Sequence, residues 1–255
     1  MTKTTVPAHS MEALMNKKLL RNLEIHSNAA AAISKVDIDS GLVGSDDGTT
    51  IMEVPSTITV DIAASGANGL DTGSEAVSTW YYLYLIYNPS TDTEAGLFSA
   101  SASSPTMPSG YTKKRLISAV YNHSGGDFLT FRQDDYEFYQ LGYQSVLAAG
   151  TATSWTAVTM GNFIPSNICR TAKMLGLAIY GGTAGVNSRQ SYIAWKTGTI
   201  WTGLMWRRGA SGDLNINTQT LDIPLDTKSP PTIWYYNTHA ASNFNLYVVG
   251  CRLNL

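Results

Sequence analysis

The stretch STWYYLYLIYN, residues 78–88, decides the fold of this chain. It carries four tyrosines and one tryptophan and not a single charged residue. Because strand side chains alternate between two faces, one face receives Tyr81, Leu83, Leu85 and Tyr87, and the other Tyr82, Tyr84 and Ile86. Both faces are apolar, so we predict a central strand covered by its own domain and by another sheet or subunit. Residues Tyr81 to Tyr87 are therefore our candidate oligomer core.

The composition of the rest of the chain also favours strands. Charged residues make up 14% of the 255 residues, against roughly 25% in an average soluble domain. The net charge is −2 and no long basic block occurs, which argues against a nucleic-acid partner. No run of about 18 apolar residues is present, which argues against membrane insertion. Cys169 and Cys251 stand far apart, so we predict buried free thiols and synthesis in a cytoplasm.

The first segment, residues 1–35, is predicted to be a short helical arm. Ser10 is a suitable N-cap, and apolar residues then recur at close to i, i+4 spacing. The stripe consists of Met11, Leu14, Met15, Leu19 and Leu23. One apolar stripe on about 15 residues is not stable alone in water. We therefore expect this arm to dock on another surface.

From about residue 35 the pattern becomes one of strands and turns. Residues 56–64 alternate, with Ile58, Val60 and Ile62 on one face. Residues 111–122 and 128–133 are predicted to pair as a hairpin around a glycine-containing turn. Seven candidate strands follow a polar boundary at 134–144. We predict a mostly β protein of antiparallel sandwich or jelly-roll domains, with a central domain at 36–135 and a C-terminal domain at 140–255.

No catalytic, metal or cofactor motif stands out in the sequence. The four histidines are His9, His26, His123 and His239, and they stand in the arm or in predicted turns, none at metal-ligand spacing. Calcium could use Asp37, Asp39, Asp46 and Asp47, but they lack the EF-hand pattern. A glycosidase needs two carboxylates across a cleft, for which Asp134, Asp135 and Glu137 are candidates. We favour a polar interdomain linker there and predict no enzyme and no cofactor.

Aromatic side chains remain as candidates for ligand binding. The chain has 6 tryptophans and 14 tyrosines. Exposed aromatic rings on β domains stack on sugars, but such rings also fill cores and subunit interfaces, and for any one tryptophan we favour core or interface. The candidate glycan-binding residues are Trp195, Trp206, Trp234 and Tyr235.

Residues 57–133 contain a characteristic order of motifs. A Gly-Leu-Asp-Thr-Gly turn precedes the aromatic strand, and a Ser-Ala-Ser run, a Pro-x-x-Pro-x-Gly-Tyr turn and a basic strand ending in Ala-Val-Tyr-Asn follow it. This order resembles a segment common in tail-fibre and other virion proteins of tailed bacteriophages. Residues 230–253 look like the last strands of a β-sandwich tip in such proteins.

The resemblance implies a trimeric β protein on the outer surface of a phage particle. The leading hypothesis is a non-enzymatic homotrimer, a short tail or head fibre, made in the host bacterial cytoplasm. Its arm would dock on other virion proteins, its central domain would carry trimer contacts, and its C-terminal domain would bind host surface polysaccharide for receptor binding. One alternative is a capsid decoration, or cement, protein that stabilises the head. The other is a polysaccharide-degrading tail tip that uses Asp134, Asp135 or Glu137.

Overall fold

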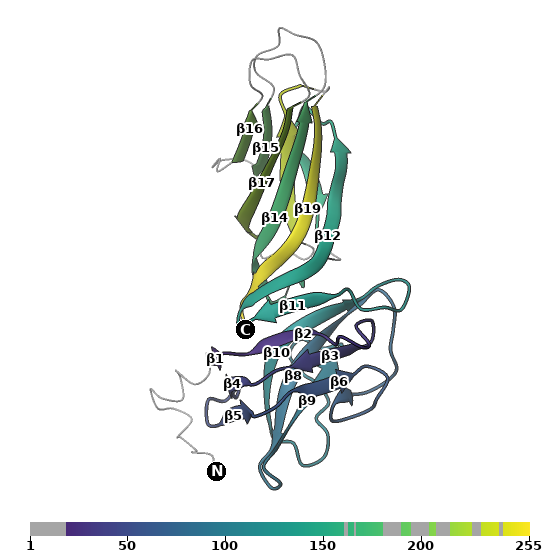
Figure 1. Ribbon diagram of the computed structural model, residues 1–255, viewed down its shortest axis with the longest axis vertical. Coiled ribbons are helices and arrows are strands. Elements are labelled where there is room, and N and C mark those ends of the chain that lie inside the picture. Colours follow the sequence, from purple (N-terminus) through teal and green to yellow (C-terminus); the bar gives the residue numbers. More distant parts are fainter. Residues whose placement is uncertain are drawn as a thin grey trace. The chain divides into compact units, whose positions relative to one another are not determined.

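All regular elements in the described part of the chain are β-strands (Figure 1). The computed structural model describes residues 19–160, 163–165, 167–180, 190–194, 204–207, 215–225, 231–239 and 242–255. The chain divides into two compact units, Met1–Leu141 with Leu255 and Gly142–Asn254. Within the described residues, no helix has the length and apolarity needed to cross a membrane. The predicted mostly β, antiparallel fold is confirmed, with one parallel strand pair, β7 with β9.

The strands of the first unit are β1 (Leu20–Arg21), β2 (Glu24–Ser27), β3 (Lys35–Ile38), β4 (Gly41–Gly44), β5 (Ile51–Val54), β6 (Ile58–Asp61), β7 (Gly69–Leu70), β8 (Thr79–Asn88), β9 (Thr93–Ser99), β10 (Lys113–Asn122), β11 (Phe131–Asp134) and the start of β12 (Glu137–Gly150). One sheet has the order β10-β8-β9-β7, and in a second the strands β12, β11, β2, β3 and β6 lie side by side in this order. A small third sheet has the order β1-β4-β5.

Strand β8 lies at the centre of its sheet, between β10 and β9, as the sequence predicts. Gly96 of β9 is the strand partner of Leu85. On one face of the sheet, a Cβ added to Gly96 would lie 2.1 Å from Val60 Cγ2 of β6. The two sheets are thus in direct contact there. On the other face, the Tyr84 hydroxyl donates to the Ser101 carbonyl oxygen at 2.9 Å.

This burial corrects the predicted oligomer core. The residues concerned are Tyr81, Tyr82, Leu83, Tyr84, Leu85, Ile86 and Tyr87, and none is more than 6% exposed within the single chain. No partner subunit can reach side chains that their own unit already covers on both faces. The sequence shows that both faces are apolar, but it does not distinguish cover by the same chain from cover by a neighbour.

The predicted hairpin between residues 111–122 and 128–133 forms only at its turn end. Leu129 N donates to the Tyr121 carbonyl at 2.9 Å, and an isolated bridge joins Asn122 to Phe128. The chain then passes to the second sheet, where β11 pairs with β2 and β12. The fully buried Phe131 stacks on Phe138 of β12, with ring centroids 5.0 Å apart.

The described end of the predicted arm belongs to the first unit. Leu20–Arg21 and Glu24–Ser27 are strands, so the predicted helix does not extend beyond residue 19. Leu23 is completely buried, and its backbone N–H donates to Asp135 Oδ1 at 3.0 Å. Leu23 is therefore a core residue and not part of a docking stripe. Met11, Leu14 and Met15 lie outside the described residues, and Leu19 directly precedes β1.

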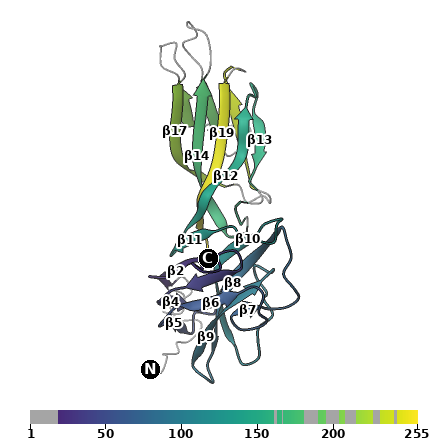
Figure 2. The same cartoon turned by 45° about the vertical axis from the view of Figure 1, so that its right-hand side comes forward.

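The second unit holds the rest of β12 together with β13 (Thr156–Thr159), β14 (Cys169–Tyr180), β15 (Gln190–Ala194), β16 (Leu204–Arg207), β17 (Asn215–Pro224), β18 (Thr232–Asn237) and β19 (Ser242–Leu253). Figure 2 shows β17, β14, β19 and β12 side by side in one sheet. The other sheet has the order β13-β18-β15-β16. Cys169 and Cys251 are both buried and neither forms a disulfide, as predicted.

Candidate functional site

A row of three aromatic rings lies across the neighbouring strands β15 and β18 and the residue before β13 in the second unit. Tyr236 of β18 lies between Trp155, which immediately precedes β13, and Tyr192 of β15. Its ring centroid lies 5.6 Å from that of Trp155 and 5.7 Å from that of Tyr192, with interplanar angles of 34° and 26°. All three side chains are partly exposed. We call Trp155, Tyr192 and Tyr236 the aromatic row.

Strand alternation puts the aromatic row on the outward face of its sheet. Along β18 the inward residues Ile233, Tyr235 and Asn237 are buried, whereas Trp234 and Tyr236 are partly exposed. Trp234 therefore shares the outward face with the row. Its glycan-binding role stays a prediction.

Tyr235 was predicted to bind glycan, but its position in the structure contradicts this. Its side chain is 5% exposed and points inward, with its ring centroid 6.3 Å from that of Phe244 on β19. Its ring would also lie 2.8 Å from a Cβ on Gly150. Tyr235 is thus a core residue, and its neighbour Tyr236 takes the outward place. Trp195 lies outside the described residues, and only the backbone of Trp206, in β16, is described.

The strands that carry the aromatic row contain no charged residue. The sequences TAVT, QSYIA and TIWYYN of β13, β15 and β18 have only neutral side chains. Tyr and Trp combine a large apolar ring with a hydrogen-bonding group and lose little side-chain entropy when they contact a ligand. Such a surface suits a neutral partner that presents both apolar faces and hydroxyl groups.

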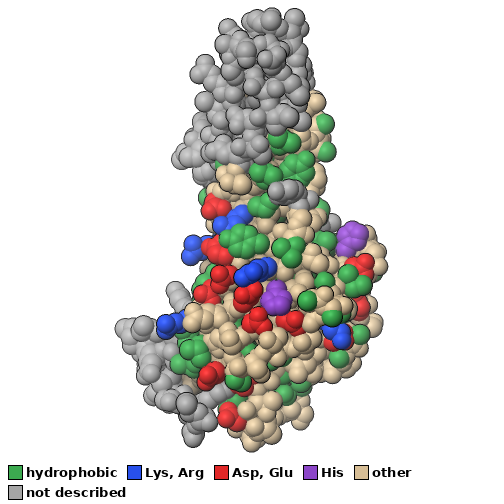
Figure 3. All heavy atoms as spheres, viewed as in Figure 1, with side chains coloured by type: hydrophobic (Ala, Val, Ile, Leu, Met, Phe, Trp, Pro, Cys, Tyr) green, Lys and Arg blue, Asp and Glu red, His purple; other side chains and the backbone are tan. Residues whose placement is uncertain are grey.

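The first unit presents a different surface, the polar face of the sheet β11-β2-β3-β6. The inward residues of this sheet include the apolar and fully buried Ile25, Val36, Ile38 and Val60. The outward residues are Glu24, His26, Asp37, Thr59 and Arg132, brought together by the strand register. Figure 3 shows acidic side chains gathered around a histidine on the face that carries β2 and β3.

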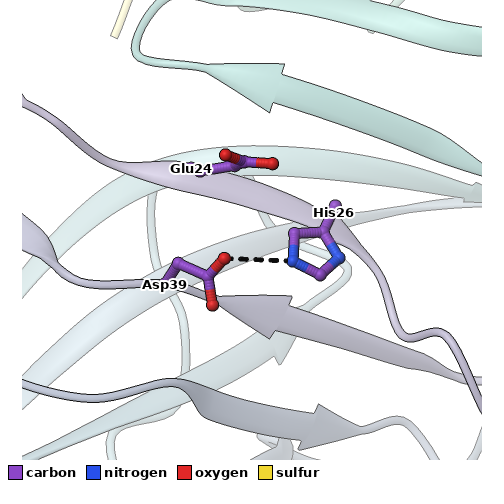
Figure 4. A group of neighbouring side chains, drawn as sticks. All are labelled: Glu24, His26 and Asp39. Carbon is purple, nitrogen blue, oxygen red and sulfur yellow. Dashed lines mark hydrogen bonds and ion pairs between the residues drawn. The ribbon is translucent and has the colours of Figure 1, made fainter.

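Three side chains of this face form a compact cluster, Glu24, His26 and Asp39 (Figure 4). Glu24 and His26 lie two residues apart in β2, and Asp39 follows β3, where its N–H donates to the Glu24 carbonyl at 2.8 Å. His26 Nε2 lies 3.2 Å from Asp39 Oδ2. His26 Nδ1 lies 3.0 Å from the Ser27 carbonyl oxygen. The sequence analysis placed His26 in the predicted helical arm, whereas it is a strand residue with a carboxylate partner.

Neighbouring groups fix the surroundings of this cluster. Arg132 Nη2 lies 3.1 Å from Glu24 Oε1. Asp37 is nearly buried and accepts hydrogen bonds from Asn28 Nδ2 at 2.9 and 3.0 Å and from Thr59 Oγ1 at 2.7 Å. Because Asp37 is already satisfied, it contributes charge to the site without being available as a further ligand.

The electrostatics of the cluster favour the protonated form of His26. Burial alone would lower the pKa of His26. The hydrogen bond to the Ser27 carbonyl and the Asp39 and Asp37 carboxylates outweigh it and raise the pKa above its ordinary 6.5.

The predicted acidic site at residues 134–137 is a hairpin turn. Asp134 pairs with Glu137 across the β11–β12 turn, so this segment is not an extended linker. Asp135 has a positive φ of 47°, and its Oδ1 accepts the Leu23 N–H. The Asp135 carbonyl also accepts from Gln133 Nε2 at 2.7 Å. Asp135 thus serves the turn, and the structure provides no arrangement of carboxylates across a cleft from these residues.

Compared with known proteins, the chain matches no protein-family model and no curated protein sequence.

Two features of these sites could not be predicted from the sequence. Tyr192 and Trp155 are far from Tyr236 in the chain, and only sheet pairing brings the three rings together. The only sequence signal for the row is the alternation in TIWYYN, which separates Tyr235 from Tyr236 once one face is known to be buried. The spacing of Glu24 and His26 is a signal only once that segment is recognised as a strand.

Proposed function

We propose that this chain is a non-enzymatic structural protein on the outer surface of a tailed-phage particle, a homotrimeric short tail or head fibre. The virion assignment rests on the motif order of residues 57–133, and the trimer on the resemblance alone. In this proposal both units are β-sandwiches, the second of jelly-roll type. The two packed sheets of each unit support this.

The second unit, in this proposal, binds a neutral host surface polysaccharide. The observation that carries this step is the aromatic row, whose three rings are partly exposed and have neighbouring centroids 5.6 and 5.7 Å apart. Pyranose rings have apolar C–H faces that contact aromatic rings and hydroxyl groups that bond to Tyr hydroxyls. Because the strands that bear the row carry no charge, a charged saccharide would find no counter-charge on them.

Binding of purified host polysaccharide tests the proposal directly. Tyr236→Ala, at the centre of the row, should weaken binding at least tenfold. The matched control is Tyr139→Ala, because Tyr139 is a tyrosine of the first unit that is 41% exposed. Equal binding by Tyr236→Ala and the parent chain would reject the glycan site.

Mass by light scattering on the same variants separates a ligand site from a subunit interface. The expected result is a trimer for both the parent and Tyr236→Ala. If Tyr236→Ala dissociates the trimer, the row is an interface and the glycan proposal fails. Antibody labelling of particles should place the chain on a fibre; labelling at capsid three-fold positions would favour the decoration protein instead.

A further inference from the structure

We propose that Glu24, His26 and Asp39 form a binding site for a divalent transition-metal ion of the zinc class. The three side chains offer one imidazole nitrogen and two carboxylate oxygens, which lie within 4.8 Å of one another. Imidazole with carboxylate suits zinc and its neighbours, whereas magnesium and calcium prefer oxygen ligands alone. This site lies in the first unit and is independent of the proposed glycan site.

The orientation of the His26 ring supports this site. The Ser27 carbonyl oxygen can only accept a hydrogen bond, so His26 Nδ1 must carry the hydrogen in their 3.0 Å contact. In the neutral ring, Nε2 is then a bare lone pair that faces Asp39 Oδ2 at 3.2 Å. In the metal-free chain a proton on Nε2 bridges this contact, and a metal ion bound between the two atoms would replace that proton. A metal-bound histidine commonly donates its other ring N–H to a backbone carbonyl in this manner.

The spacing of the donor atoms fits coordination of one ion. Zinc bonds to nitrogen and oxygen of about 2.1 Å in a tetrahedron place neighbouring ligand atoms about 3.4 Å apart. The 3.2 Å from His26 Nε2 to Asp39 Oδ2 is close to this value. Glu24 has three rotatable side-chain bonds with which to approach. Three protein ligands leave a fourth position for water or for a group on a partner molecule.

Asp39 is also held in place by a neighbour. Thr57 Oγ1 donates to Asp39 Oδ1 at 2.6 Å, which leaves Oδ2 directed toward His26. Two of the three ligands therefore have an outer partner that fixes their orientation, Ser27 for His26 and Thr57 for Asp39. Such outer partners raise metal affinity because the ligands need no reordering on binding.

Arg132 competes with the metal ion for Glu24. Its Nη2 lies 3.1 Å from Glu24 Oε1, and its side chain is 58% exposed, so it can turn away into solvent. Binding of a dication must break this ion pair and overcome the repulsion of the guanidinium. Two substitutions should therefore change the metal affinity in opposite directions. Loss of Arg132 should strengthen metal binding, and loss of a ligand should weaken it.

Calorimetric titration of the metal-stripped full chain with zinc chloride tests the site. The parent should bind one zinc ion per chain, and His26→Gln should raise the dissociation constant at least tenfold. His123→Gln is the matched control, because His123 lies in a turn of the same unit, where its Nδ1 bonds the Gly125 N–H. This control should bind as the parent does. No zinc binding by the parent, or unchanged binding by a folded His26→Gln chain, would overturn the proposal.

Two further measurements distinguish the loss of a metal ligand from a general effect on folding. Arg132→Gln should lower the dissociation constant a few-fold, and weaker binding in that variant would remove Glu24 from the ligand set. X-ray absorption of the zinc-loaded chain should show nitrogen and oxygen ligands with one imidazole. Sulfur ligation would assign the bound zinc to Cys169 or Cys251 and overturn the proposal.

Discussion

Tyr235 and Tyr236 are consecutive in β18, yet one ring packs on Phe244 in the core and the other lies in the aromatic row on the surface. The period of two residues in a strand sends them to opposite faces of one sheet. The same residue type therefore has two roles at adjacent positions, and each role predicts a different response to substitution.

Tyr235→Ala should destabilise the second unit by about 3 to 5 kcal/mol, because it leaves a large cavity against Phe244. Tyr236→Ala should cost about 1 kcal/mol or less, since it removes only partly exposed ring contacts. Denaturant unfolding, followed by a probe in the second unit, measures both values. Equal costs for the two substitutions would contradict the assignment of faces.

Gly96→Ala should destabilise the first unit by about 1 to 3 kcal/mol through overpacking. Its Cβ would lie 2.1 Å from Val60 Cγ2, so one of the two sheets must move. In a Val60→Ala background the same substitution should cost less, because the clashing methyl group is gone. A double-mutant cycle of unfolding free energies measures this coupling, and strict additivity would argue against the contact.

Leu85→Asp should prevent the first unit from folding. Leu85 is completely buried, so the new carboxylate would lose its hydration without gaining a partner of opposite charge. Because Leu85 is buried by residues of its own chain, the substitution should impair folding of the single chain, before any subunits assemble. Circular dichroism and protease sensitivity of the dilute chain provide the measurement. A folded but monomeric Leu85→Asp chain would restore the interpretation of this strand as a subunit interface.

Stability in acid should depend on Asp47 in the turn between β4 and β5. Burial alone would raise the pKa of Asp47, but hydrogen bonds from Lys113, Ser45 and Thr49 outweigh it and hold the pKa far below the ordinary 3.8. A lowered pKa contributes stability above the unfolded-state value, and that contribution is lost as the pH falls through the folded-state value.

Asp47→Asn should therefore cost about 1 kcal/mol or less at pH 7, because this ion pair is partly exposed, and the difference should shrink below pH of about 3.8. Denaturant unfolding at several pH values gives the comparison. In a Lys113→Met background the cost should fall, since the 2.6 Å contact between Lys113 Nζ and Asp47 Oδ2 is absent. A difference that grows in acid would have the wrong sign for this interaction.

The sequence by itself determined the β class, the central place of β8 and the inward positions of Val60 and Ile62. These follow from local periodicity and from the scarcity of charge, both of which can be read without knowing any partner strand. The burial of Leu23, by contrast, fits a helical stripe and a strand end equally well in the sequence. The flanking strands β1 and β2 and its hydrogen bond to Asp135, 112 positions away, decided between them.

The tertiary structure alone decided which residues meet. The hairpin predicted for 111–133 gave way to a crossing between sheets because β11 pairs with β2, a strand about a hundred residues earlier in the chain. Register across strands likewise placed Trp155 and Tyr192 beside Tyr236 and Asp39 beside His26. Pairing between distant strands depends on the packing of the whole unit, and single-sequence periodicity carries no information about that partner choice.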